Sequence, residues 1–305
     1  MIHIETPLLH SALLSAKSGT NIWLKMDALQ PTASFKARGV GFACTKYVAD
    51  GATLLVSSSG GNAGLAVAYS SRQLGVPATI VVPKVTPKRA IQLMRAEGAS
   101  VEVAGESWLE AHSKALKLAE EPNSAYIHPF DDPYVWEGHS TLADEFVQSG
   151  VPFDGVILSV GGGGMLSGVV MGLKRHGLNV PILAMETIGA DSYNTAVTTN
   201  EHVTLPEITS LANTLGAKQV AAKAFELYED HPIVSDVVSD KTAVQACVDF
   251  LDDHRVLVEP ACGATLSAVY ERNAFLNGKK NVIVVVCGGA GITQETLRKF
   301  VKMTS

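Results

Sequence analysis

The sequence predicts an α/β protein built from open, twisted parallel sheets with helices on both faces. Three observations carry this prediction. Short runs of Val, Ile and Leu alternate along the chain with longer segments that have helix start and stop residues, as at 53–75 and 156–176. Glycine-rich turns directly follow some of these runs, as at 161–164. No tandem repeat or low-complexity tract interrupts the alternation, so the same layered architecture should extend over the whole chain.

The composition suits a globular protein with neither a nucleic-acid nor a membrane partner. The 305 residues are enough for one large domain or two moderate ones, and 47% of them are hydrophobic. The net charge of -6 and the lack of a basic block argue against nucleic-acid binding. No apolar run approaches the roughly 18 residues that cross a bilayer, and the N-terminus lacks the basic region of a signal peptide. The four cysteines form no C-x-x-C pair and suit a reducing compartment, so we expect a cytoplasmic protein.

The first half of the chain contains five expected strands, at residues 22–26, 53–56, 78–82, 101–103 and 125–128. Helices are expected from Lys36, between the loop at 57–64 and Leu74, from Thr86 to Gly98, and over residues 107–120. Thr32 or Ser34 should cap the first of these helices, and Thr86 the third. Gly75 should end the second, because glycine readily adopts the left-handed conformation that follows a helix.

The second half continues the same pattern after Gly155. Strands are expected at residues 156–160, 182–185 and 281–286. Helices are expected over residues 165–176, 217–228 and 240–252, and from Thr293. Residues 187–216 are rich in Thr, Ser, Asn and Gly, so they should be irregular, with a short helix.

Two interruptions of the pattern predict two domains. The alternation pauses near Gln30-Pro31 and again at the turn-rich residues 129–133. We therefore expect a small domain, residues 31–131, inserted into a large domain formed by residues 1–30 and 132–305. A ligand that uses both domains would lie in the cleft between them.

Lys36 is the first candidate catalytic residue. It lies between Phe35 and Ala37, in a chain of which only 18% is charged, so its amine need not be solvated. Burial would lower its pKa and make the amine a nucleophile toward a carbonyl, which is the chemistry of a Schiff base with pyridoxal phosphate. The alternative is an ordinary surface lysine at a helix start. Lys36 by itself favours that alternative, and three further stretches reverse the preference.

The tetraglycine run at 161–164 follows a buried strand and opens a helix. Glycines allow the backbone to approach an anion, and a helix N-terminus supplies unpaired N–H groups, so a phosphate is the natural guest. One alternative is a tight turn without a ligand. The other is a dinucleotide fingerprint, with Glu186 at a suitable distance, but Leu166 replaces its third glycine. A single phosphate is the favoured interpretation.

Residues 58–64 also lie between a strand and a helix. The hydroxyls, N–H groups and helix dipole of this loop suit a small carboxylate, and the amide of Asn62 could donate to a ring oxygen. A capped helix with small residues for close packing is an equally good explanation of this loop taken alone. Cys287 ends an apolar strand and begins Gly-Gly-Ala-Gly, at the edge where open α/β sheets bind ligands. The alternative for Cys287 is a buried core thiol.

Taken in order, these four stretches resemble the fold-type II pyridoxal-phosphate enzymes. The resemblance is greatest to the L-serine dehydratase/L-threonine deaminase family and covers essentially the whole chain. Four further stretches also look like the short dehydratases of that family: residues 129–133, 136–139, 184–187 and 258–263.

The resemblance implies a role for each candidate residue. Lys36 would form the Schiff base with pyridoxal 5'-phosphate, and Phe35 would pack on one face of its ring. Three further cofactor contacts are implied: the phosphate at Gly161, Gly162, Gly163 and Gly164, the ring hydroxyl at Asn62, and the ring nitrogen at Cys287. The substrate would be bound by Ser58, Ser59, Gly61 and Phe130.

The implied activity is that of a lyase of amino-acid catabolism. It would be β-elimination of L-serine, L-threonine or both, to pyruvate or 2-oxobutanoate plus ammonia, by a homodimer. Gly60 stands where liver-type serine dehydratase carries alanine and should leave more room beside the substrate, so the preferred substrate stays open. The alternatives are a dehydratase of a bulkier 3-hydroxy amino acid, a serine racemase on the same scaffold, and a non-catalytic or nucleotide-binding protein.

A cation site is also expected from the resemblance. Glu186 and Ala190 match the metal loop of fold-type II racemases, but Ser192 replaces its second carboxylate. One carboxylate with backbone carbonyls, including that of Leu215, suits a monovalent cation better than a divalent one. Potassium is therefore the candidate ion.

Overall fold

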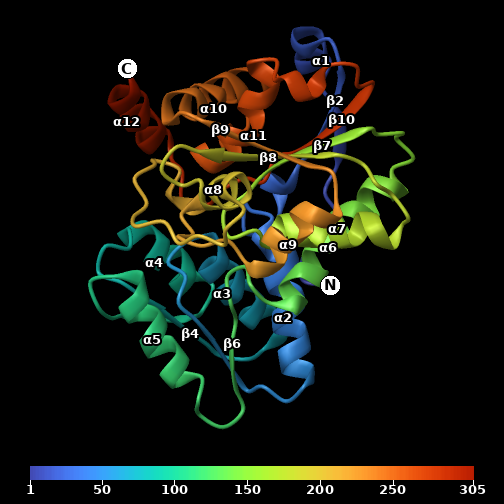
Figure 1. Cartoon of the computed structure of the whole chain (residues 1–305). Helices are drawn as coiled ribbons and strands as arrows, with labels where there is room; N and C mark the ends of the chain where they lie inside the picture. Colours follow the sequence, from blue (N-terminus) through green and yellow to red (C-terminus); the bar gives the residue numbers. More distant parts are fainter.

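Two β-sheets organise the chain in the computed structural model, which describes residues 1–305 (Figure 1). The larger sheet has six strands in the order β1 (Leu8–His10), β2 (Asn21–Lys25), β10 (Asn281–Val285), β7 (Gly155–Ser159), β8 (Ile182–Thr187) and β9 (Ile233–Val238). All neighbours in it are parallel except the edge strand β1, which runs antiparallel to β2. The predicted α/β class with parallel sheets is confirmed.

The smaller sheet is entirely parallel. Its four strands follow the order β5 (Ser100–Val103), β4 (Ala78–Val82), β3 (Leu54–Ser57) and β6 (Ser124–Tyr126). These strands come from one continuous stretch of the chain, whereas the larger sheet draws its strands from both ends. The domain boundaries at residues 31 and 131 stay a prediction.

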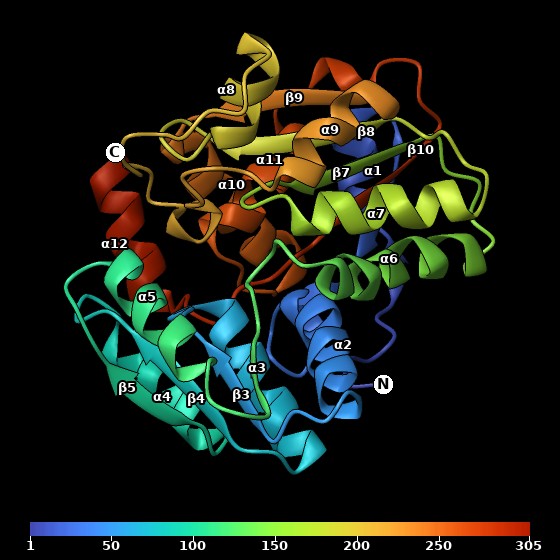
Figure 2. The same ribbon diagram turned by 60° about the horizontal axis from the view of Figure 1, so that its bottom comes forward.

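Twelve α-helices connect and cover the two sheets (Figures 1 and 2). Their bounds are α1 (Ala12–Ser18), α2 (Lys36–Ala49), α3 (Asn62–Leu74), α4 (Lys88–Ala96), α5 (Trp108–Leu118), α6 (Pro133–Gln148), α7 (Gly164–Arg175), α8 (Ser192–Thr199), α9 (Ala222–Asp230), α10 (Asp240–His254), α11 (Pro260–Tyr270) and α12 (Gln294–Thr304). Three short 3₁₀ turns complete the structure: η1 (Asp27–Leu29), η2 (Asn213–Leu215) and η3 (Ala274–Leu276). None of the helices combines the length and apolar character that crossing a bilayer requires.

Helix α6 is the largest element that the sequence pattern does not predict. Its start lies in the turn-rich stretch, where the Asp132 carboxylate accepts the N–H groups of Tyr134 and Val135 and a proline occupies the first turn. Gly138 lies inside the helix, where a side chain would collide with the carbonyl of Arg38 in α2. The glycine that weakens the helical pattern thus allows α6 to pack closely against α2.

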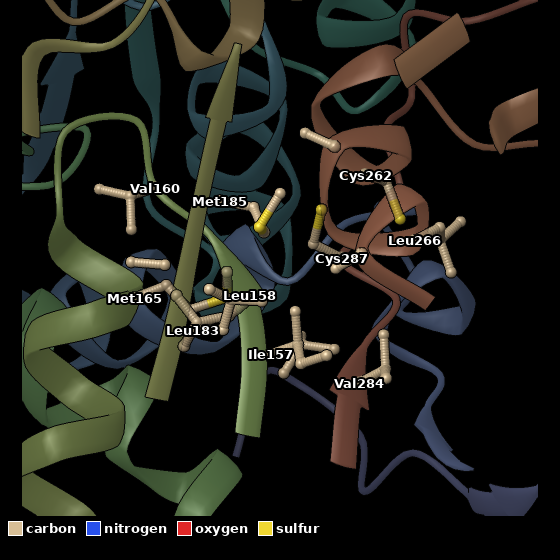
Figure 3. Close-up of a cluster of buried hydrophobic side chains, with 14 of the residues drawn as sticks. Ile157, Leu158, Val160, Met165, Leu183, Met185, Cys262, Leu266, Val284 and Cys287 are labelled. Carbon is tan, nitrogen blue, oxygen red and sulfur yellow. The ribbon is translucent and has the colours of Figure 1, made fainter. Parts of the chain in front are cut away.

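Each sheet has its own hydrophobic core. The larger core joins 50 buried residues around the six-stranded sheet, and part of it is drawn in Figure 3. The smaller core joins 17 residues, among them Val40 from α2 and Val135 from α6. Helix α2 contacts both α3 and α6, and α6 lies side by side with α7 (Figure 2). These helices therefore connect the two sheets.

A buried ion network fixes α2 against the large sheet. The Arg38 guanidinium is fully buried and donates to both carboxylate oxygens of Asp27, at 2.7 and 2.8 Å. It also donates to Glu145 on α6, which in turn contacts the buried Lys25 of β2. The network balances two cations with two carboxylates, which is the condition for keeping charges in a low-dielectric interior. It holds the helix that begins at Lys36.

Replacing Asp27 by alanine should destabilise the fold by about 3 kcal/mol, because Arg38 would keep its charge in the interior with one carboxylate fewer. Urea unfolding followed by circular dichroism measures this loss. The matched control is Arg72→Ala, which breaks the exposed Arg72–Glu97 pair and should leave the midpoint nearly unchanged. Equal midpoints for the Asp27→Ala variant and the wild type would contradict the proposed importance of the network.

Candidate active site

Lys36 is the first residue of α2, and its amine forms no salt bridge with a carboxylate. Its backbone N–H donates to the Ser34 hydroxyl at 3.1 Å. Phe35 occupies the N-cap position and no side chain caps α2, so the cap expected at Thr32 or Ser34 is wrong. The Lys36 amine donates to the carbonyl of Pro129 at 2.5 Å and lies 5.0 Å from the ring centre of Phe35. Burial lowers the pKa of Lys36 from 10.5 to about 8. The amine is therefore available as a nucleophile near neutral pH.

A short backbone pairing places Lys36 next to Cys287. Residue Ser34 forms an isolated antiparallel bridge with Gly288, and the Phe35 N–H donates to the Cys287 carbonyl at 3.1 Å. Gly288 has φ +90°, and a side chain there would meet the Ala33 carbonyl at 2.3 Å. The glycine after Cys287 is thus required both by its backbone conformation and by the close approach of the segment before Lys36.

The tetraglycine loop presents a row of free backbone donors. None of the N–H groups of residues 161–166 donates a hydrogen bond within the chain, and no side chain caps α7. A side chain at Gly162 would strike the ring of Phe130 at 2.1 Å, and one at Gly163 would strike Ala224 at 2.4 Å. A helix N-terminus with free donors and no side chains fits a phosphate group.

The second loop, residues 58–64, offers a similar set of donors at the start of α3. The N–H groups of residues 58–60 and 62–64 have no partner in the chain. A side chain at Gly64 would collide with the Ser59 carbonyl at 1.8 Å, so the loop is closed tightly on itself. The Ser58 hydroxyl is engaged elsewhere, by Tyr126. The backbone of this loop, rather than the Ser58 hydroxyl, is therefore free to bind a carboxylate.

The room expected beside Gly60 is already filled. A side chain at Gly60 would lie 2.8 Å from both Cγ2 and Oγ1 of Thr86. Thr86 does not cap α4, because Pro87 occupies the N-cap position and no side chain caps that helix. Its side chain instead packs against the loop, so the expectation of extra space at Gly60 is corrected.

Asn62 is held by two residues from the C-terminal part of the chain, Glu259 before α11 and Ala290 after β10. Its Nδ2 donates to Glu259 Oε1 at 2.7 Å, and its Oδ1 accepts from the Ala290 N–H at 3.0 Å. The same Glu259 oxygen accepts from the Thr214 hydroxyl at 2.9 Å. Burial raises the pKa of Glu259 to about 7, although these two hydrogen bonds partly oppose the shift. Asn62 therefore has a fixed orientation.

Cys287 lies at the end of β10 among polar sulfur and oxygen atoms. Its Sγ is 3.6 Å from the Ser159 hydroxyl. Figure 3 shows Cys262 near it. The neighbouring Cys262 thiol and burial both raise the pKa of Cys287 well above its usual value. The thiol is therefore neutral.

The turn after β6 connects Lys36 to the tetraglycine loop. His128 Nδ1 accepts the N–H groups of Phe130 and Asp131 at 3.3 and 2.7 Å, which shapes the turn that carries the Pro129 carbonyl. Burial lowers the pKa of His128 to about 4, so its ring is neutral and able to accept both bonds. The ring of Phe130 then lies on Gly162.

These contacts close into one site. Lys36 touches Pro129, whose neighbour Phe130 covers the tetraglycine loop, and that loop packs against Leu215. Thr214, beside Leu215, donates its hydroxyl to Glu259, which also accepts the hydrogen bond from Asn62. The structure thus brings together the predicted residues Phe35, Lys36, Asn62, Phe130, Gly161, Gly162, Gly163, Gly164 and Cys287, with the loop at 58–64 adjoining them.

The predicted cation ligands lie at the edge of this site. Glu186 is fully buried in β8, and its carboxylate accepts the N–H groups of Tyr193 at 3.0 Å and Asn194 at 2.6 Å. Ala190 forms an isolated antiparallel β-bridge with Thr187, and the backbone of Leu215 packs against Gly161. No basic side chain contacts Glu186, and burial raises its pKa to about 8. Glu186 is thus a buried carboxyl without a basic partner, and the cation expected there stays a prediction.

Several residues of the site were not selected from the sequence. Glu259 lies in a stretch that supported the resemblance, but nothing in its local pattern indicated a contact with Asn62. Tyr126 and His112 join Ser58 from two other elements, and His139 packs its ring 5.0 Å from that of Phe35. These contacts depend on the fold, so only the final arrangement reveals them.

Comparisons with known proteins agree with the geometry. A family model described as pyridoxal-phosphate dependent enzyme matches residues 1–288. The chain is 48% identical to the human L-serine dehydratase/L-threonine deaminase over 308 residues, covering 97% of this chain and 94% of the relative. It is 45% identical to the mouse serine dehydratase-like protein, over 97% of this chain and 93% of that one. Among solved structures, the L-serine ammonia-lyase of the fungus Rhizomucor miehei superposes with a TM-score of 0.94 at 37% identity, covering 100% of this chain and 99% of that one.

The lowered pKa of Lys36 predicts selective labelling of the cofactor-free protein. At pH 8 about half of the Lys36 amines should be neutral, about a hundredfold more than for an ordinary lysine. Brief acylation over pH 6–10, read by mass spectrometry of peptides, should therefore show Lys36 reacting with a midpoint near pH 8. The exposed lysines of the same sample provide the internal comparison. A Lys36 profile that follows theirs would contradict the role of burial.

Proposed function

The chain belongs to the pyridoxal-phosphate-dependent enzyme family, and we propose that it is an ammonia-lyase that acts on L-serine and L-threonine. The products are pyruvate or 2-oxobutanoate, with ammonia. The observation that carries this function is the juxtaposition of a half-buried Lys36, whose amine has no carboxylate partner, with two rows of free backbone N–H groups. The near-complete match to relatives named for this activity supports the same conclusion.

The residues present fit pyridoxal phosphate. The free donors of residues 161–166 would hold its phosphate, and Lys36 would hold its aldehyde carbon. Phe35 and Asn62 would face its ring, Asn62 with the amide proton that Glu259 leaves free. When bound, the cofactor supplies an electron sink for the substrate α-carbon.

Lys36 is the proton carrier in the proposed mechanism. Its amine has no carboxylate partner and a pKa near 8, so at neutral pH it exchanges readily between charged and neutral forms. In its neutral form it takes the proton from the α-carbon of the bound amino acid. The loop at 58–64 meanwhile holds the substrate carboxylate through its backbone N–H groups, which fixes the α-carbon relative to Lys36.

Cys287 limits the kinds of reaction that the site favours. Because its thiol is neutral and already lies within hydrogen-bonding distance of Ser159, it offers no negative charge to a ring nitrogen. A weak hydrogen-bond partner at that position stabilises a carbanion poorly. Prompt loss of the β-hydroxyl group is therefore favoured over the long-lived carbanion that transamination or racemisation requires.

A monovalent cation at Glu186, Ala190 and Leu215, a homodimer and a cytoplasmic location are further parts of the proposal. The cation is supported by the buried Glu186 carboxyl, which has no basic partner. The location is supported by four free cysteines and no disulfide. The dimer rests on the family resemblance.

The Lys36→Ala variant should lose turnover of L-serine and L-threonine, measured as 2-oxo acid production. A loss of at least about a thousandfold is expected, because both covalent attachment and proton transfer depend on the same amine. Lys46→Ala, which removes an exposed lysine from the same helix, is the matched control and should keep wild-type rates. Undiminished pyruvate formation by Lys36→Ala, or D-serine as the main product of the wild type, would refute this assignment.

The cation proposal predicts a dependence on the ion in solution. Potassium should raise the rate more than sodium, because a loose ring of neutral oxygens suits the larger and more easily dehydrated ion. Glu186→Ala should weaken retention of the cofactor on gel filtration more than it alters the ratio of serine to threonine turnover. Identical rates in potassium, sodium and tetramethylammonium would leave Glu186 with only a structural role.

A further inference from the structure

Three side chains from three different elements meet beneath the loop at 58–64. The Ser58 hydroxyl lies 2.7 Å from the Tyr126 hydroxyl, and His112 Nδ1 lies 2.9 Å from Tyr126 and 3.3 Å from Ser58. Ser58 follows β3, Tyr126 ends β6, and His112 belongs to α5. On the outer side, Trp108 stacks on the His112 ring at 4.6 Å with an angle of 10° between the planes. The three polar groups therefore form a closed triangle.

All three members of the triangle are neutral. Burial lowers the pKa of His112 and raises the pKa of Tyr126 to about 12. Ser58 is fully buried, so its hydroxyl has no access to water. A neutral ring nitrogen and two hydroxyls at these distances direct each other's protons, and the Ser58 side chain is held toward β6 and α5.

The backbone of Ser58 continues directly into the free donors of the loop. Its own N–H group and those of Ser59 and Gly60 have no partner in the chain. Holding the Ser58 side chain restrains the Cα to which it is attached, and this limits the movement of the peptide groups on both sides of it. Without the triangle, the loop would have to order these donors at the moment of binding, which costs affinity.

We propose that Tyr126 and His112 are positioning residues for the carboxylate of the amino-acid substrate, acting through Ser58 on the donors of residues 58–60. The inference rests on the proposed function, since it takes the loop as the carboxylate site. Neither residue touches the reacting atoms, so their contribution is to substrate binding and not to the chemical step. Trp108 keeps the His112 ring in place by stacking on its outer face.

The test uses the cofactor-loaded enzyme and separates KM from kcat. Tyr126→Phe and His112→Phe each should raise the KM for L-serine about tenfold and change kcat less than twofold. The double variant should be no worse than either single variant, because both changes open the same triangle. His112→Asn, whose Oδ1 can reach the place of Nδ1, should recover most of the affinity. Tyr47→Phe is the matched control, as it removes a hydroxyl bonded to Asp132 outside the triangle and should leave KM unchanged.

Calorimetric binding of glycine provides a second measurement that does not depend on turnover. Glycine carries the same carboxylate and amine but no leaving group, and its Kd should rise by the same factor as KM. An unchanged glycine Kd in both Phe variants, or additive losses in the double variant, would overturn the inference. If the wild type binds glycine but forms no 2-oxo acid from L-serine or L-threonine, the proposed function is refuted instead. Melting temperatures show whether any variant fails to fold. If a Phe variant does, the glycine Kd values of His112→Asn and Ser58→Ala are compared with that of the wild type. The Kd of Ser58→Ala should rise, because this change also opens the triangle.

Discussion

The site depends on lowering the pKa of one amine while a neighbouring base stays fully charged. Lys36 and Arg38 lie two residues apart at the start of α2, where Arg38 is fully buried and Lys36 is half-buried. Arg38 has two carboxylates, Asp27 and Glu145, whereas Lys36 has only the neutral carbonyl of Pro129. The same desolvation therefore gives a stable ion at one position and a weak base at the other. The distribution of carboxylates, more than burial itself, determines which residue is reactive.

The second principle of the site is the use of backbone as ligand. Both anion loops join the carboxyl end of a parallel strand to the start of a helix, one in each sheet. Each loop is formed mainly by glycine and serine, so no side chain separates its N–H groups from a ligand. The two sheets are then connected by side-chain contacts, from Asn62 to Glu259 and from Phe130 to Gly162. Rigid donors on two sheets can hold the two ends of one ligand.

Much of this arrangement could be predicted from the sequence, and the reasons for the failures are specific. The apolar runs and the glycines at the ends of elements predict the inner strands and most helices, because those signals are local. Helix α6 was missed because Gly138 and the prolines before it resemble a turn, whereas packing on α2 requires that glycine. The helix cap expected at Thr86 was wrong, since its side chain packs on Gly60. Tyr126 and His112 have no local signal, because their role exists only when β3, β6 and α5 meet.

The order of strands in the large sheet also sets the order in which the protein becomes functional during synthesis. Strand β2 lies between β1 and β10, so on one side it pairs with residues 281–285, near the end of the chain. A nascent chain can complete the small sheet from local segments long before the ribosome has produced β10. Until then, the segment before Lys36 lacks Cys287 and Gly288, the residues that hold it. A truncated chain that lacks β10 would therefore contain Lys36 without the backbone contacts to Cys287 and Gly288 that hold the segment before it.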